Sequence, residues 1–337
     1  MKRKLFIIFL LINITLLNFI GCTKVSDETP VSKQGFYFDT IITITLYGKD
    51  KDSILSDCFK IADKYDTEFS TTKTNGDIYR INHSNGLPVT VADDTIELLN
   101  KGIWYTKMSH GVFNITLGQL SNLWNFDDQT KTTIPTDTQI QEALSTIDID
   151  AISIQGNEVT MKNPNTQIDL GGIAKGYIAD KMKEYLLKKH ITSGIINLGG
   201  NVLTIGKKMD NTSYSVGIQK PFAEDGTPIA TLQIADSSVV TSGTYQRYYR
   251  INHELYHHLL DLSTGYPMNN DLSSVTIVNA SSVDGDALST ICFLYGLNKG
   301  KAYIESLDHT EAIFVTTDNK VYYTSGLKDK ITIVNGN

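Results

Sequence analysis

The order in which strand-like and helix-like segments follow one another is the feature that most constrains the fold of this chain. Short runs rich in Ile, Val, Thr and Tyr outnumber the segments in which apolar residues recur at helical spacing. The two kinds of segment do not alternate in the regular β-α-β order of a doubly wound parallel sheet, so the order predicts an α+β fold. No boundary is visible inside residues 35–334, and we expect this range to form one large mixed domain.

The expected helices have apolar residues three and four positions apart, and the expected strands are rich in β-branched and aromatic residues. Helices are expected at 52–69, 93–110, 173–190 and 283–295, with a shorter one after Leu297. Strands are expected at 36–47, 152–154, 159–161, 168–170, 195–197, 201–205, 214–218, 229–234 and 239–241, and in a closing hairpin at 310–316 and 321–324. Cys58 and Cys292 each lie in a helical apolar pattern, which indicates core residues rather than a disulfide or metal pair.

The first 22 residues have the layout of a secretory signal. A positively charged start, Lys2-Arg3-Lys4, precedes an apolar run over 5–20 that ends at Gly21-Cys22. This run is short for a permanent membrane span, which needs roughly 20 apolar residues. A Cys at this place resembles the lipobox of bacterial lipoproteins, although Phe19 stands where Leu is usual.

We therefore expect residues 1–21 to be a signal peptide, Cys22 to become the lipidated amino terminus, and the polar segment 22–34 to form a flexible tether. Two acyl chains would hold the protein stably at the cell membrane, on its extracytoplasmic face. The alternative is a plain anchor helix with an incidental Cys.

Charge excludes one class of partner. The chain has 30 Lys and Arg residues against 37 Asp and Glu residues, which gives a formal net charge of −7. No basic cluster occurs beyond the first four residues. We therefore expect no nucleic-acid partner.

A glycine-rich segment, Ile168-Asp-Leu-Gly-Gly-Ile-Ala-Lys-Gly176, runs from an expected strand into an expected helix. Glycines at the start of a helix let the backbone approach a ligand, and the free amides there favour phosphate. Lys175 adds a positive charge in the first helical turn. The spacing fits neither the Walker loop nor the Gly-x-Gly-x-x-Gly fingerprint, so a phosphate site and a packing turn both remain open.

A second segment, 283–290, holds Asp286 and Thr290 four positions apart, on one face of the expected helix. A carboxylate and a hydroxyl are hard oxygen ligands that suit Mg²⁺. The alternative is that Asp284 or Asp286 caps the helix start, and the segment alone favours this cap.

Two more segments place functional residue types next to strand ends. In 256–267, His257 and His258 precede a turn, where a His can act as a general base or be an ordinary surface residue. In 239–248, Tyr245 can stack on a flat ring and Arg247 can pair with an anion, or both can be plain surface residues.

Taken in order, these four segments together with Asn197-Leu-Gly-Gly-Asn201 resemble the ApbE family of FAD:protein FMN transferases. Three upstream segments fit the same pattern: Phe38-Asp-Thr40, Glu68-Phe-Ser70 and Gly111-Val-Phe-Asn-Ile-Thr116. The resemblance covers 35–326. It implies a single α+β domain of the ApbE, T-fold-like type that follows a lipoprotein signal peptide.

The resemblance also implies an activity. Members of the family split the pyrophosphate of FAD and transfer FMN to a threonine hydroxyl of a target protein, with Mg²⁺ required and AMP released. Matched residue by residue, the metal would lie between the Asp286 carboxylate, the Thr290 hydroxyl and the Gly172 carbonyl, with the FAD pyrophosphate completing its shell. His258 matches the base that deprotonates the acceptor threonine. The FAD pocket would comprise Phe38, Asn82, Val112, Phe113, Asn114, Lys175, Tyr245 and His258.

Two positions depart from the family pattern. Leu262 stands where the family commonly has Pro, and Asn114 stands where it often has Asp. Neither is an expected metal ligand. Two rival functions remain open: an FAD pyrophosphatase that uses water as acceptor, and a non-catalytic FAD-binding lipoprotein. The family's usual targets are membrane redox proteins.

Overall fold

The computed structural model describes residues 29–48, 51–128 and 130–334 of the 337-residue chain. The expected signal peptide, Cys22 and residues 22–28 of the tether lie outside the described residues, so these expectations stay predictions. In the part that is described, no helix combines the length and the apolar character that crossing a membrane requires.

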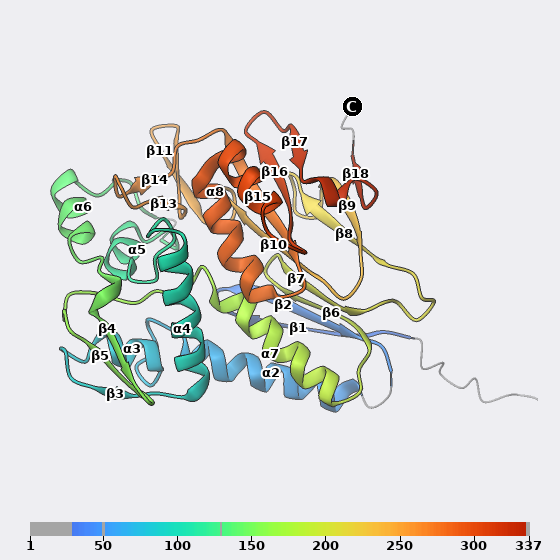
Figure 1. Ribbon diagram of the computed structural model, residues 1–337, viewed down its shortest axis with the longest axis horizontal. Helices are drawn as coiled ribbons and strands as arrows, with labels where there is room; N and C mark the ends of the chain where they lie inside the picture. Colours follow the sequence, from blue (N-terminus) through green and yellow to red (C-terminus); the bar gives the residue numbers. More distant parts are fainter. Residues whose placement is uncertain (1–28, 49–50, 129, 335–337) are drawn as a thin grey trace, which may run out of the picture.

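An eight-stranded antiparallel sheet organises the domain (Figure 1). Its strand order is β1-β2-β6-β7-β10-β15-β16-β17. The strands are β1 (Val31–Tyr37), β2 (Thr40–Leu46), β6 (Ser193–Leu198), β7 (Asn201–Gly206), β10 (Ser238–Gly243), β15 (Leu272–Asn279), β16 (Glu311–Thr316) and β17 (Val321–Tyr323). Every neighbouring pair is antiparallel, which confirms the α+β expectation.

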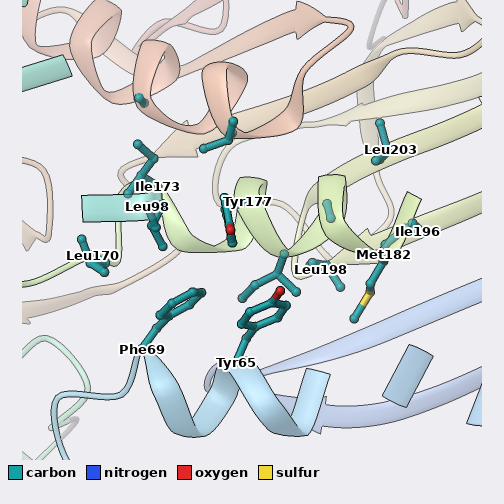
Figure 2. Close-up of a cluster of buried hydrophobic side chains, with 14 of the residues drawn as sticks. Tyr65, Phe69, Leu98, Leu170, Ile173, Tyr177, Met182, Ile196, Leu198 and Leu203 are labelled. Carbon is teal, nitrogen blue, oxygen red and sulfur yellow. The ribbon is translucent and has the colours of Figure 1, made fainter. Parts of the chain in front are cut away.

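Three helices lie along one face of this sheet: α2 (Lys51–Glu68), α7 (Ala174–Lys188) and α8 (Ser282–Glu305). Figure 2 shows their shared core, in which Tyr65, Phe69 and Tyr177 meet. The Tyr65 and Phe69 rings stack with centroids 5.1 Å apart, and the Tyr177 ring lies edge-on, 5.9 Å from each. Aromatic pairs with this geometry add to the free energy gained by burying the rings.

A smaller sheet covers part of the other face. Its strands, β8 (Tyr214–Gln219), β9 (Pro228–Ile234) and β18 (Ile331–Ile333), are antiparallel in the order β18-β9-β8. Leu232 from this sheet is fully buried in one cluster with Val239 and Val315 from the large sheet. The domain is thus layered as helices, large sheet and small sheet.

The remaining elements form a third region beside the first strands of the chain (Figure 1). It contains α3 (Asp77–Asn82), α4 (Asp93–Met108), α5 (Gly118–Trp124), α6 (Asp137–Leu144), η1 (Ile149–Ala151) and the sheet of β3 (Val89–Thr90), β5 (Glu158–Met161) and β4 (Ile152–Gln155). Two hairpins, β11 (Tyr248–Ile251) with β12 (Glu254–His257) and β13 (Leu260–Asp261) with β14 (Tyr266–Pro267), join it through the cluster around buried Trp124. A 3-10 turn, η2 (Ser325–Leu327), precedes β18.

Most expected helices and strands are confirmed, including the break between the last two helices. These two helices share the label α8, but Gly296 has φ +73° and ψ 174°, which interrupts the helical backbone between them. Cys58 and Cys292 are free and buried, as expected for core residues.

The expected strand at 36–47 is two strands. Phe38 and Asp39 have φ of +54° and +57° and form the turn between β1 and β2. β1 begins at Val31, four residues before the expected domain start at 35. Because β1 is an edge strand, polar residues such as Ser32 and Gln34 are exposed on it. Its sequence therefore lacks the apolar pattern from which a strand is predicted.

The expected strand at 168–170 is wrong. The backbone of Ile168 bonds to a side chain instead of to a neighbouring strand. The Ile168 amide donates to Asn82 Oδ1 at 2.7 Å, and Asn82 Nδ2 donates to the Ile168 carbonyl at 2.8 Å. The Asp169 amide donates to the Ile115 carbonyl at 2.8 Å. The glycine-rich segment is therefore anchored by single contacts from two distant parts of the chain rather than by a sheet.

We predict that Gly176→Ala destabilises the protein by about 1–3 kcal/mol, a typical cost of overpacking. A Cβ at Gly176 would lie 2.3 Å from the Ser282 carbonyl oxygen, and backbone cannot yield cheaply. Denaturant unfolding measures the change. Gly217→Ala is the control, because its Cβ would meet Pro228 at an ordinary 3.6 Å. Equal stability of the two variants would contradict the close packing of α7 on α8.

Candidate active site

The first turns of α7 and α8 meet at a backbone-to-backbone contact, which Gly176 permits. At this junction the Gly176 amide donates to Asp286 Oδ2 at 2.9 Å. Among the residues that the structure describes, the Gly176 amide is the group that donates a hydrogen bond to the Asp286 carboxylate. A residue of the glycine-rich segment and the carboxylate expected to bind metal are thus in direct contact.

Asp286 is not the cap of α8. Ser281 is the N-cap, and its Oγ accepts from the Asp284 amide at 3.3 Å. Asp180 of α7 accepts from the amides of Ser282 and Val283, each at 2.9 Å. These two side chains satisfy the exposed amides of the helix start. The capping explanation for Asp286, which the sequence alone favoured, is therefore wrong.

Asp180 is a functional-site neighbour that the sequence analysis missed. Burial raises the pKa of its carboxyl, while the two α8 amides act in the opposite direction. The available signal was an acidic residue in the middle of an expected helix, directly after the apolar residues Ile178 and Ala179. An acid in that position needs a partner inside the protein.

Asp284 also has a structural role. Its Oδ1 accepts from Tyr105 Oη and from Lys101 Nζ, each at 2.7 Å. Of the two acidic residues proposed as caps, Asp284 is thus in an ion pair with Lys101 of α4, whereas Asp286 contacts α7.

Asp286 has the electrostatics of a cation-binding carboxylate. Its side chain is 5% exposed, and burial raises the pKa of its carboxyl. Lys175 and the Gly176 amide act in the opposite direction and favour the charged form. A buried carboxylate that is charged requires positive charge beside it. The α7 N-terminus and Lys175 supply part of this charge.

Thr290 lies one turn further along α8 and is tied to the end of β10. Its Oγ1 lies 3.2 Å from Ser242 Oγ, which also lies 2.7 Å from Ser289 Oγ. Ser289 Oγ in turn donates to the Asp286 carbonyl at 2.8 Å. The helix face that carries Asp286 and Thr290 is therefore held against β10 through hydroxyl groups.

Across residues 29–48, 51–128 and 130–334, no group of three or more His, Cys, Asp or Glu side chains is arranged to hold a metal ion. The ligand set expected from the resemblance has a different composition, since only Asp286 belongs to these residue types. The other two ligands are a hydroxyl, Thr290, and a backbone carbonyl, Gly172.

The two adjacent histidines differ sharply. His257 is 5% exposed, packs edge-on against Phe293 and makes a 3.2 Å hydrogen bond from Nε2 to the Met268 carbonyl. Burial lowers the pKa of His257 to about 4, against the effect of that hydrogen bond. His257 is thus a core residue, and His258 remains the candidate base.

His258 has the tautomer that a base requires. Its Nδ1 lies 3.2 Å from the Arg247 carbonyl, and because a carbonyl only accepts, Nδ1 carries the proton and Nε2 has the free lone pair. Burial and the nearby cations Arg247 and Lys175 lower the pKa of His258 to about 3. The Lys175 charge therefore acts on both His258 and Asp286.

Of the other expected pocket residues, Phe113 lies against the glycine-rich segment. A Cβ at Gly172 would lie 3.0 Å from the Phe113 ring, so Phe113 covers that turn. Next to Phe113, Asn114 Oδ1 accepts from the amide and the hydroxyl of Thr116 at 2.9 and 2.8 Å. The Val112 amide donates to the Ser109 carbonyl at 3.4 Å.

Asn82 and Phe38 are both held by hydrogen bonds to other parts of the chain. The oxygen and the nitrogen of the Asn82 side-chain amide both bind Ile168, so Asn82 positions the glycine-rich segment. Phe38 lies in the β1–β2 turn, where its backbone amide donates to Asp66 Oδ1 at 2.8 Å.

Tyr245 lies on the other side of β10 from Asp286. Ser242 points to α8, whereas a Cβ on the next residue, Gly243, would lie 2.7 Å from the Tyr245 ring. The Tyr245 ring meets Phe222 edge-on at 6.0 Å, and burial raises the pKa of its hydroxyl. The structure thus does not bring Tyr245 into the group formed by Asp286, Lys175 and His258.

Arg247 is already paired. Its Nε and Nη2 both donate to the Asp127 carboxylate, at 2.9 and 2.5 Å. A bidentate pair of this kind uses two of the five N–H donors of the guanidinium. The expectation that Arg247 pairs with an anion is met within the chain.

A family model described as the ApbE family matches residues 38–314. The chain belongs to the ApbE family. It is 32% identical over 303 residues to a protein of Klebsiella pneumoniae (strain 342) named FAD:protein FMN transferase, which covers 89% of this chain and 93% of that protein. It is 29% identical to a protein of the same name from Treponema pallidum (strain Nichols), over 90% of this chain and 89% of that protein.

Solved structures agree with the family assignment. The ApbE protein of Thermotoga maritima superposes with a TM-score of 0.81 at 27% identity, over 89% of this chain and 98% of that chain. The flavin transferase ApbE of Vibrio cholerae gives 0.79 at 25% identity, over 90% and 99%. The expected single α+β domain of the ApbE type is thereby confirmed.

We predict that His258 stays neutral from pH 8 to pH 5, with the proton on Nδ1, because burial and nearby cations hold its pKa at about 3. Nitrogen-detected NMR of the imidazole rings reports both the tautomer and the charge, and His258→Gln assigns the signal. A His258 resonance that titrates near the ordinary value of roughly 6.5 would contradict this environment.

Proposed function

We propose that this protein is an Mg²⁺-dependent FAD:protein FMN transferase that moves FMN from FAD to a threonine hydroxyl of a target protein and releases AMP. The names of its relatives and its membership of the ApbE family support flavin transfer. One observation carries the assignment to this site: the buried Asp286 carboxylate is bound by the α7 N-terminus, next to Lys175 and one turn from Thr290.

The residues at the junction fit the expected metal. Asp286 has no capping role in α8, and it shares a helix face with the Thr290 hydroxyl. Carboxylate, hydroxyl and backbone carbonyl oxygens are ligands that Mg²⁺ accepts, with phosphate oxygens and water completing the shell. Asp286, Thr290 and the Gly172 carbonyl would therefore hold the ion. When bound, Mg²⁺ neutralises negative charge on the diphosphate of FAD.

Residues of the chain itself would bind the diphosphate and accept the proton of the threonine. Lys175 and the α7 N-terminus attract the diphosphate and stabilise negative charge that develops on it. His258 accepts the proton of the threonine hydroxyl at Nε2. The threonine oxygen then bonds to the phosphorus of the FMN half, the bond from that phosphorus to the bridging oxygen breaks, and AMP leaves with that oxygen.

We further propose that the protein acts from a lipid anchor at Cys22 on the extracytoplasmic face of the cell membrane. The charged start, the apolar run and the Cys that follows Gly21 support this location. The acceptor would then be a membrane or extracytoplasmic redox protein, whose threonine takes up FMN.

Incubation with FAD, Mg²⁺ and a candidate acceptor protein tests the function. We expect a fluorescent flavin–protein adduct that survives denaturing electrophoresis, together with one AMP per adduct. Release of AMP and free FMN without an adduct would instead establish a pyrophosphatase. Intact FAD that binds and is not consumed would establish a binding protein.

We predict that Asp286→Asn lowers the transfer rate by roughly 10³-fold, because the loss of metal-based charge stabilisation is worth several kcal/mol. The rate of adduct formation at saturating FAD and Mg²⁺ measures the effect. Asp329→Asn is the matched control, since Asp329 is exposed between η2 and β18. A wild-type rate in Asp286→Asn would refute the metal assignment.

His258→Gln should slow transfer by roughly 10²–10⁴-fold, the usual contribution of a general base, and leave FAD affinity within a few-fold of wild type. Rate and affinity are measured separately, by adduct formation and by equilibrium titration. If His258→Gln loses FAD binding in proportion to its rate, the residue supports the pocket instead of acting as the base.

A further inference from the structure

Asn201 is a buried amide that the protein leaves unsatisfied. Its side chain is 2% exposed, yet neither Oδ1 nor Nδ2 has a hydrogen-bond partner within the described part of the chain. Buried polar groups in native proteins are nearly always paired, because an unmade hydrogen bond loses the free energy of hydration. An amide with a donor and an acceptor both unpaired therefore calls for a partner outside the chain.

The fold places Asn201 beside the junction of α7 and α8. Asn201 is the first residue of β7 and pairs directly with Val240 of β10. Directly paired residues share a face of the sheet, and Val240 faces α8, because a Cβ at Gly285 would lie 2.9 Å from it. Asn201 therefore points to the helix-covered face, next to the turn of α8 that continues into Asp286.

The turn before Asn201 brings it to the end of the strand. Gly199 and Gly200 have φ of +65° and +94°, and a Cβ at Gly199 would lie 2.5 Å from Thr40. Glycine is required at this turn because the backbone is left-handed and the space is filled by Thr40. The turn fixes Asn201 at the strand start while Leu203 and Ile205, on the same face, enter the core.

The neighbouring polar side chains already have partners. Ser242, which lies on the same face of β10 as Val240, has its Oγ within hydrogen-bond distance of Ser289 and Thr290. Both polar atoms of the Asn201 side chain are thus available to hydrogen-bond a ligand.

We infer that the Asn201 side chain is a substrate-binding group that hydrogen-bonds a hydroxyl of FAD next to the diphosphate; this rests on the proposed function. A phosphate oxygen would satisfy only Nδ2, whereas a hydroxyl both donates and accepts and satisfies the whole amide. FAD carries such hydroxyls on both sides of its diphosphate, on the ribityl chain and on the adenosine ribose. Asn201 thus selects the sugar-like part of the substrate.

Asn201→Leu tests this inference in the full-length protein. Leu has a similar volume and no polar atoms, so the ligand-free Tm should stay equal to that of wild type or rise, because an unpaired amide is lost. FAD affinity, measured by fluorescence titration with Mg²⁺ present, should fall roughly 10- to 100-fold, since the pair made with substrate disappears. Asn201→Ala, which also lacks both polar atoms, repeats the affinity test if the Leu variant does not fold.

Thr204→Val on the same strand is the matched control. Thr204 Oγ1 donates to the Ser237 carbonyl and accepts from the Ser237 amide, each at 3.0 Å. This variant should therefore lose Tm and keep wild-type FAD affinity. The opposite pattern for the two variants would overturn the inference.

Fragments separate the two sources of the hydroxyl. If Asn201→Leu weakens FMN binding and leaves ADP binding unchanged, the partner is on the ribityl chain; the reverse result assigns it to the ribose. Unchanged affinity for FAD in Asn201→Leu overturns the inference while the transferase proposal stands. Failure of the wild-type protein to bind FAD overturns both.

Discussion

The hydrogen bond from the Gly176 amide to the buried Asp286 carboxylate joins the first turns of α7 and α8, and the site depends on it. It forms only because Gly176 lets the two backbones touch and because Asp180 and Ser281 cap α8, which frees Asp286 from capping. The consequence is a buried carboxylate beside a positive helix end. Such an arrangement favours a cation and an anionic diphosphate together, which links the packing of two helices to the chemistry proposed for the family.

Local periodicity was sufficient to predict most of the fold. The helices α2, α4 and α7 lie within two residues of their expected ends, because each buries one face with helical spacing. Helices α3, α5 and α6, the hairpins β11–β12 and β13–β14 and the buried strand β15 were not predicted. Two further misses are non-local. β1 is a polar edge strand whose existence depends on β2, and residues 168–170 are held by Asn82, which is 86 residues away. Neither partner is visible in the segment itself.

Individual site residues were proposed from the sequence only through the family resemblance. Asp286 near a helix start fits both a cap and a metal ligand, and the choice depends on Gly176, 110 residues earlier in the chain, and on Asp180. The two histidines are indistinguishable in sequence, and burial against Phe293 separates them. The position of Tyr245 on the far side of β10 and the unpaired amide of Asn201 follow from strand alternation and tertiary packing.

The central claim is that the junction of α7 and α8 holds a divalent cation together with FAD. Anomalous diffraction at the manganese edge, from crystals grown with FAD and Mn²⁺ in place of Mg²⁺, tests it most directly. The account predicts one strong peak within coordination distance of the Asp286 carboxylate, the Thr290 hydroxyl and the Gly172 carbonyl, next to the diphosphate. FAD bound with no peak at this junction, or with the peak elsewhere, would contradict the account.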